Sequence, residues 1–144
     1  MIDKIDHVAL AVADLEAAIE LYGTLWGLEL SHREIVEDQG VEEAMFRIGE
    51  SQIQLMRPLG PDTIIGKFIQ RRGEGLHHIA YQVDDLEAAL ESLRSGGLHL
   101  VDEKPRRGSR GLRVAFVHPK DNKGLLVELV ERPSPANPPG QAES

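Results

Sequence analysis

Two histidines occupy equivalent places in two similar stretches of the chain. His7 lies in the segment DHVALAV and His78 in HHIAYQV, 71 residues further on. Both segments alternate between apolar and other residues as a β-strand does, so each histidine belongs to a defined face of its strand. Neutral imidazole is a common ligand of divalent transition metals. The pair therefore suggests two ligands of one divalent-metal site.

Two more polar residues interrupt apolar runs later in each half of the chain. Gln54 lies in SQIQLM and Glu128 in GLLVELV, 74 residues apart. A length difference of three residues within the second half would make these positions equivalent too. Carboxylate and amide oxygens bind divalent ions, and four such ligands on an octahedral ion leave two positions open to a chelating substrate. We predict a metal site formed by His7, Gln54, His78 and Glu128.

Three of these assignments have a competing interpretation. His77 adjoins His78 but has the opposite parity on its strand, so we expect it to point away from the site. Gln52 has the same parity as Gln54 and competes with it. Glu128 could instead be a charge at a sheet edge, although its apolar neighbours would make an unpaired charge there costly.

The two histidines belong to a longer internal repeat. Residues 5–21 and 76–92 are identical at nine of 17 positions when aligned with the offset of 71. In each copy an alternating strand is followed by an aspartate suited to cap a helix, Asp14 or Asp85, and then by apolar residues with helical spacing. The repeat predicts two related halves, and a cleft between such halves is a favourable place for a ligand.

Each half has room for three more strands after its helix. We expect strands at residues 28–34, 41–48 and 52–57 in the first half, and at 99–103, 112–118 and 125–131 in the second. An apolar stripe that ends at Gly73 predicts a helix between the halves. The fold class is therefore α+β, with paired βαβββ modules.

These elements fit one domain over residues 1–132. Its parts are module one at 1–58, a linking helix at 59–73 and module two at 74–132. The remaining segment, 133–144, reads PSPANPPGQAES, and its proline and glycine content predicts disorder.

Composition excludes several classes of protein. The chain has 144 residues, with 16 basic and 24 acidic side chains and a formal net charge of −8, which disfavours sequence-independent binding to nucleic acid. It has no cysteine, so disulfides and thiolate metal sites are excluded. It has neither a signal-peptide pattern nor an apolar run long enough to span a membrane. We expect a cytoplasmic protein with no membrane partner.

The chain also resembles a known family. The segments DHVALAV, DQGVEEAMF, QIQLM, GLHHIAYQVDDL and HPKDNKGLLVELVE resemble those of methylmalonyl-CoA epimerases, in the vicinal oxygen chelate or glyoxalase/bleomycin-resistance superfamily. The resemblance covers about residues 2–132. It implies the vicinal oxygen chelate fold, with a central metal cleft and the four ligands named above. For the ion it implies cobalt first, with manganese, nickel and zinc as alternatives.

The resemblance also implies a reaction. Glu43 would be the catalytic base, with Glu42 facing away, and Glu128 would serve the opposite face of the substrate as well as the metal. The two epimers of methylmalonyl-CoA would interconvert by 1,1-proton transfer through an enolate. By analogy we expect a homodimer.

Two rival functions share the fold. A glyoxalase I-type lactoylglutathione isomerase would more commonly have a glutamate at the position of Gln54. A drug-binding module of the bleomycin-resistance type would need an aromatic-rich cleft, and aromatic residues make up only 4% of this chain.

Overall fold

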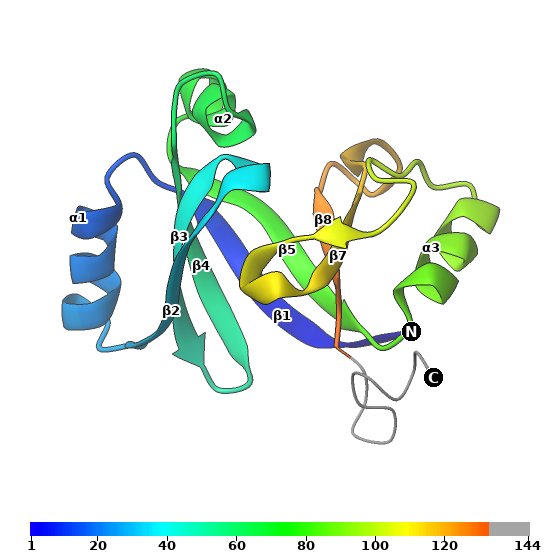
Figure 1. The fold of residues 1–144 in the computed structure, drawn as a ribbon, viewed down its shortest axis with the longest axis horizontal. Coiled ribbons are helices and arrows are strands. Elements are labelled where there is room, and N and C mark those ends of the chain that lie inside the picture. The colour runs from blue at the N-terminus through cyan, green and yellow to red at the C-terminus, as the bar shows by residue number, and fades with distance from the viewer. Residues whose placement is uncertain (133–144) are drawn as a thin grey trace. The chain divides into compact units, whose positions relative to one another are not determined.

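The computed structural model describes residues 1–132, and the segment predicted to be disordered, 133–144, lies outside the described residues. The chain divides into two compact units (Figure 1). Among the described residues, the first unit is residues 6–79, and the second unit is residues 1–5 together with residues 80–132. The chain passes between the units within strands β1 (Ile2–Ala11) and β5 (Gly75–Val83). Over the described residues, no helix is both long and apolar enough to cross a membrane.

The first unit contains a four-stranded sheet and two helices. Its strands run in the order β2-β3-β4-β1, where β1 is parallel to β4 and the other neighbours are antiparallel. The further elements are β2 (Glu29–Val36), β3 (Val41–Ile48), β4 (Ser51–Pro58), α1 (Leu15–Glu20) with a π-helical extension at Leu21–Leu25, a 3-10 turn at Glu37–Gln39, and α2 (Ile64–Arg72).

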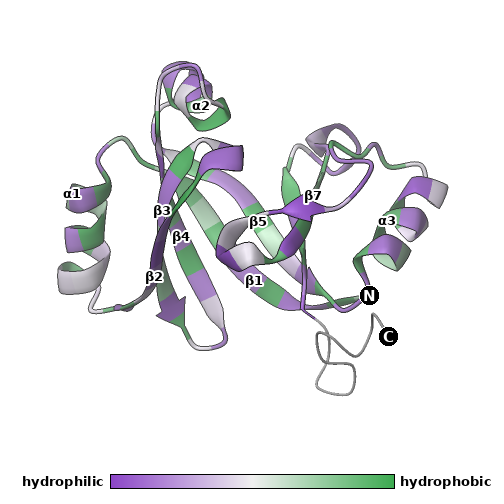
Figure 2. Cartoon of the chain, viewed as in Figure 1, coloured by the Kyte–Doolittle hydropathy of each residue, from purple (hydrophilic) through white to green (hydrophobic). Residues whose placement is uncertain are grey.

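The two faces of this sheet are covered differently. Hydrophobic and hydrophilic residues alternate along its strands, as expected for a sheet whose faces differ (Figure 2). Helix α1 packs on one face, in a core cluster made of Val12, Leu15, Ala44, Phe46 and Leu55. On the opposite face, Ile65 of α2 joins a cluster made of Ala9, Ala11, Val36, Val41 and Met56. The helix α2 is the predicted linking helix, and it covers only the part of this second face formed by those residues.

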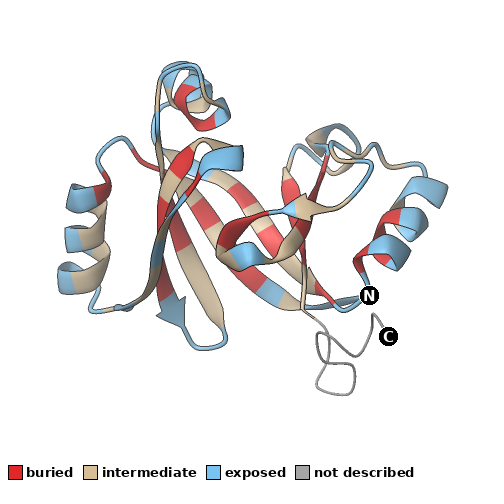
Figure 3. Cartoon of the chain, viewed as in Figure 1, coloured by how far each residue is buried: buried red, intermediate tan, exposed pale blue. Residues whose placement is uncertain are grey.

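The second unit repeats the pattern of the first. Its strand order is β5-β8-β7-β6, and its helix is α3. The bounds are α3 (Leu86–Ser95), β6 (Arg106–Arg107), β7 (Arg113–Val117) and β8 (Val127–Glu131), with 3-10 turns at Ser109–Gly111 and Pro119–Asp121. Buried residues gather along the strands and on one side of α3 (Figure 3). Both units thus follow the predicted βαβββ order.

Equivalent aspartates begin the two repeated helices. The side chain of Asp14 accepts a hydrogen bond from Ala17 N at 3.1 Å, and that of Asp85 accepts one from Ala88 N at 3.0 Å. Each satisfies a backbone N–H that would otherwise have no partner in the first turn. The predicted helix starts are confirmed.

One predicted strand is wrong. Residues 99–103 do not form a strand, and only an isolated bridge joins Leu100 to Val117. The carboxylate of Asp102 accepts the hydrogen bond from Phe116 N at 2.9 Å. A backbone carbonyl would accept that bond in a continuous ladder, so a side-chain contact replaces part of the ladder here. The edge of the sheet is formed further along the chain, by β6.

Candidate metal and catalytic site

Three polar residues share the face of the first-unit sheet that lies opposite α1. Gln54 of β4 pairs with Met45 of β3 on one side and with Ala9 of β1 on the other. Because residues two apart on a strand face the same way, His7 and Glu43 lie on the same face as Gln54. Their exposed fractions are 1% for His7, 0% for Glu43 and 2% for Gln54. The sheet register therefore brings three of the predicted site residues to one buried surface.

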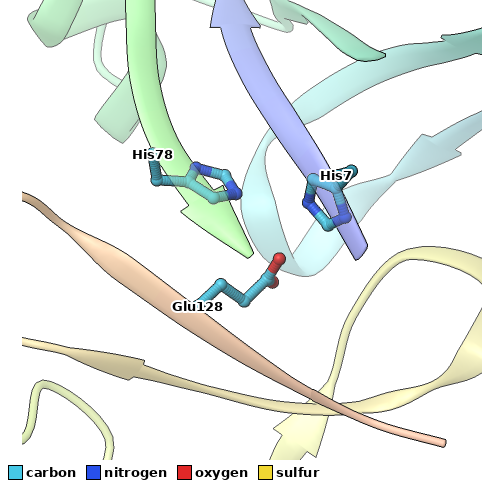
Figure 4. A group of neighbouring side chains, drawn as sticks. All are labelled: His7, His78 and Glu128. Carbon is cyan, nitrogen blue, oxygen red and sulfur yellow. The ribbon is translucent and has the colours of Figure 1, made fainter. Parts of the chain in front are cut away.

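The two predicted histidine ligands lie next to each other. Figure 4 shows the rings of His7 and His78 extending toward one another from β1 and β5. Their ring centroids are 5.5 Å apart with an interplanar angle of 75°, and each ring offers a nitrogen within 4.8 Å of a nitrogen of the other. Both side chains are buried. Two neighbouring buried imidazoles can share one cation.

Each histidine has a hydrogen-bond partner in the residue that precedes it. His7 Nδ1 lies 2.7 Å from Oδ2 of Asp6, and both side chains are buried. His78 Nδ1 lies 2.8 Å from Nδ1 of His77. In both rings Nδ1 is engaged, so the nitrogen that could bind an ion is Nε2.

The amide of Gln54 connects the metal ligands to the predicted base. Its Nε2 donates a hydrogen bond to Oε2 of Glu43 at 2.5 Å. Its Oε1 is buried and accepts no hydrogen bond from any of the described residues. An amide binds a metal ion through its oxygen, so this orientation suits a ligand. The competing Gln52 is only half-buried and accepts a hydrogen bond from Ser31 Oγ at 2.5 Å, which favours Gln54.

The two adjacent glutamates of β3 lie in opposite environments. Glu43 is fully buried, whereas Glu42 forms ion pairs with Arg57 at 3.0 Å and Arg33 at 3.2 Å. Hydrogen bonds from Arg57 and then from Arg33 lower the pKa of the Glu42 carboxyl, against the opposing effect of burial. Glu42 is thus held as a charged surface group, on the strand face opposite to that of Glu43.

The fourth predicted ligand, Glu128, belongs to the second unit. It lies on β8 opposite Phe116 of β7, its exposed fraction is 3%, and Figure 4 shows its side chain extending from the strand. The strand β8 has hydrogen-bonded neighbours on both sides, β5 and β7. The interpretation of Glu128 as a charge at a sheet edge is therefore wrong. A carboxylate buried in the middle of a sheet needs a compensating partner.

Sequence reasoning missed three polar residues near these groups. Asp6 contacts His7, as described above. On β2, His32 Nε2 lies 2.8 Å from Oε1 of Glu34, and each of these side chains has an atom within 4.8 Å of a carboxylate oxygen of Glu43. Glu34 pairs directly with Glu43 in the β2–β3 ladder. Antiparallel pairing of the two strands expected at residues 28–34 and 41–48 would have been the signal for this contact.

Comparisons with known proteins show which family this chain is similar to. The family model described as Glyoxalase/Bleomycin resistance protein/Dioxygenase superfamily matches residues 6–116. The ethylmalonyl-CoA/methylmalonyl-CoA epimerase of Cereibacter sphaeroides is 38% identical over 131 residues, which are 90% of this chain and 98% of that protein. The crystal structure of methylmalonyl-CoA epimerase from Mycobacterium tuberculosis is 47% identical, with a TM-score of 0.88, covering 94% of this chain and 91% of that one. A methylmalonyl-CoA epimerase in complex with methylmalonyl-CoA and NH4+ is 40% identical, with a TM-score of 0.89, covering 96% of this chain and 100% of that one.

Proposed function

The chain belongs to the glyoxalase/bleomycin resistance protein/dioxygenase superfamily, and we propose that it is a methylmalonyl-CoA epimerase. This isomerase would interconvert the (2R) and (2S) epimers of its substrate. Relatives with that activity in their names are similar along nearly the whole chain. The observation that carries the proposal is the hydrogen bond between Gln54 and Glu43, because it joins a candidate base to a candidate metal ligand inside one buried surface.

The reaction requires a proton to leave a carbon and return on the opposite face. In methylmalonyl-CoA the reacting carbon lies between a thioester and a carboxylate. A carboxylate is a weak base toward a carbon acid, so negative charge must be stabilised on the thioester oxygen as the proton leaves. The site therefore needs a base, a group that stabilises the enolate, and access for a proton on both faces.

We propose Glu43 as the base on one face. Its carboxylate is fully buried, and the hydrogen bond from Gln54 fixes one of its oxygens. Removal of the proton from carbon would leave Glu43 as the neutral acid. Delivery of a proton to the other face completes the inversion. The proposed donor there is the carboxyl group of Glu128 in its protonated form, and exchange with solvent then returns both glutamates to their starting protonation.

We propose His7, Gln54, His78 and Glu128 as the ligands of a divalent ion. The donor set of two imidazoles, one amide oxygen and one carboxylate suits cobalt, manganese, nickel or zinc, with cobalt expected first. The buried Oε1 of Gln54, which accepts no hydrogen bond from the described residues, supports the fit, as does the engagement of Nδ1 in both histidines. A bound ion would supply Lewis-acid stabilisation of the enolate.

From the sequence we also propose that the protein is a homodimer and is located in the cytoplasm. We further propose that both modules belong to one domain, in which Glu128 is a shared ligand. The proposed partner is the coenzyme A thioester alone, with no nucleic acid, in keeping with the net charge of −8.

The proposal is tested by comparing two substrates. Cobalt-loaded protein is incubated with one pure epimer of methylmalonyl-CoA, and the other epimer is measured by chiral separation. The same preparation is incubated with methylglyoxal and glutathione, and the thioester product is followed by absorbance. We expect epimerisation without isomerase activity on the glutathione adduct. The reverse result would assign the chain to the rival glyoxalase I-type reaction.

A further inference from the structure

We infer that His77 is a positioning residue that sets the tautomer of His78, as Asp6 does for His7. The inference rests on the proposed metal site and adds to it the residues that prepare its two histidines. The sequence had predicted that His77 would point away and take no part. His77 contacts the ring of His78, so it can orient that proposed ligand without binding the ion itself.

The first repeat shows how such a contact works. A carboxylate only accepts hydrogen bonds, so in the 2.7 Å contact between Asp6 Oδ2 and His7 Nδ1 the ring must donate. A neutral His7 ring in this contact has its proton on Nδ1 and its lone pair on Nε2. Asp6 and His7 are both buried, which keeps water from replacing this bond. A histidine held in this way offers one defined nitrogen to a cation.

The second repeat places a different residue at the same position. With the offset of 71, the equivalent of Asp6 is His77. The contact between His77 Nδ1 and His78 Nδ1 is 2.8 Å, so one ring must donate and the other must accept. If His78 presents the Nε2 lone pair to a cation, its proton is on Nδ1. His77 must then accept at Nδ1, as a neutral imidazole with its proton on Nε2.

The helix α2 holds the ring of His77 in place. The rings of Phe68 and His77 meet edge to face, with centroids 4.9 Å apart and an interplanar angle of 85°. The guanidinium of Arg72, one helical turn further on, lies 5.9 Å from the centre of the Phe68 ring. The linking helix thus supports a residue that in turn orients a proposed ligand. Loss of such a supporting contact typically lowers metal affinity about 10-fold to 100-fold.

Two substitutions of His77 separate the hydrogen bond from the packing. His77→Asn keeps an acceptor oxygen near the position of Nδ1 but removes the ring that packs on Phe68. His77→Phe keeps an aromatic ring but removes the acceptor. The matched control is His99→Phe, because His99 likewise has a side-chain partner, the carboxylate of Asp121, but is exposed and outside the proposed ligand set. His78→Ala removes the proposed ligand itself.

The measurement is the affinity of the metal-free protein for Co²⁺, by calorimetric titration of each full-length variant. We expect His77→Phe to bind about 10-fold to 100-fold more weakly than the wild type, and His77→Asn to stay within about threefold. A second readout is the ¹H–¹⁵N spectrum of the histidine rings in the metal-free wild type, which should show His78 protonated on Nδ1.

Other outcomes would overturn either the proposed role of His77 or the proposed metal site. Tight binding by His77→Phe, or equal weakening in both His77 variants, would show that the acceptor does not set the affinity. Protonation of His78 on Nε2 in the metal-free wild type would show that His77 does not hold His78 in the proposed tautomer. If His78→Ala binds Co²⁺ as the wild type does, the proposed metal site itself fails, whatever the His77 variants do.

Discussion

Gln54 donates a hydrogen bond from Nε2 to Oε2 of Glu43 over 2.5 Å, and neither side chain exposes more than 2% of its surface. The bond orients two groups at once. It fixes one oxygen of the proposed base, and it turns the amide oxygen of Gln54 away from that base. A carboxylate in place of the Gln54 amide would have no N–H to donate to Glu43. The amide is therefore needed for this hydrogen bond.

Replacing this amide by a carboxylate should impair turnover. In Gln54→Glu the N–H donor is lost and two buried carboxylates face each other, so one of them must hold a proton. We expect kcat for epimerisation to fall about tenfold or more. Gln52→Glu is the matched control, because Gln52 lies on the same strand face but is half-buried and bonded to Ser31. A Gln54→Glu enzyme with normal kcat would show that the bond to Glu43 has no role in the reaction.

Removal of the metal should destabilise the fold. An ion that binds only the folded protein adds about 2.7 kcal/mol when its concentration is 100 times Kd. We expect the melting temperature to rise on addition of Co²⁺ to chelator-treated protein, as measured by scanning calorimetry. His7→Ala should lose this response, because its ring nitrogen is one of the proposed ligand atoms. An identical rise in wild type and His7→Ala would place the ion elsewhere.

The ion pairs of Glu42 predict a small dependence of stability on pH. Arg57 and Arg33 lower the pKa of Glu42 in the folded state. A carboxyl with a lowered pKa stabilises the fold above its unfolded pKa of about 4.3, and that contribution is lost as pH falls through the folded value. We expect Glu42→Gln to lower the free energy of unfolding by about 1 kcal/mol or less at pH 7. Urea titrations from pH 7 to pH 3 should show the difference vanishing at the acid end.

Helix α2 depends on a close approach that only glycine permits. A Cβ on Gly66 would lie 2.4 Å from the carbonyl oxygen of Gly60 and 2.9 Å from that of Pro61. Both are backbone atoms, so the helix would have to shift. We expect Gly66→Ala to reduce the free energy of unfolding by about 1–3 kcal/mol in urea titrations. Gly60→Ala is the control, since a Cβ there meets no atom within 4 Å; equal losses in the two variants would contradict this reason.

The order of the elements was predictable because the repeat encodes it twice. The matching segments around His7 and His78 gave the strand and helix of each module, and Asp14 and Asp85 begin their helices as expected. The exception, residues 99–103, was not predictable from apolar pattern. There the side chain of Asp102 takes a backbone hydrogen bond, and such a contact depends on a neighbouring strand that is distant in sequence.

Positions on strand faces were also predictable, but side-chain partners were not. Parity gave His7 and His78 equivalent faces on their strands because the strand period is two, whereas the common face of His7, Glu43 and Gln54 follows from the sheet register. The contact of His77 with His78 escaped this reasoning, since a side chain that starts on the opposite face can still turn its ring toward its neighbour. The preference for Gln54 over Gln52 likewise depends on a hydrogen bond from another strand.

The most direct test of the account is the exchange of the substrate α-proton in heavy water. Metal-loaded wild type, Glu43→Gln and Glu42→Gln are each incubated with methylmalonyl-CoA, and α-deuteration is followed by mass spectrometry. Glu43→Gln keeps the size of the side chain but removes the base, so the rate of deuteration should fall about 100-fold or more while Co²⁺ affinity is retained. Glu42→Gln, with the same change on the opposite face of the strand, should stay near the wild-type rate. Equal rates in the two variants would contradict the assignment of Glu43 as the base.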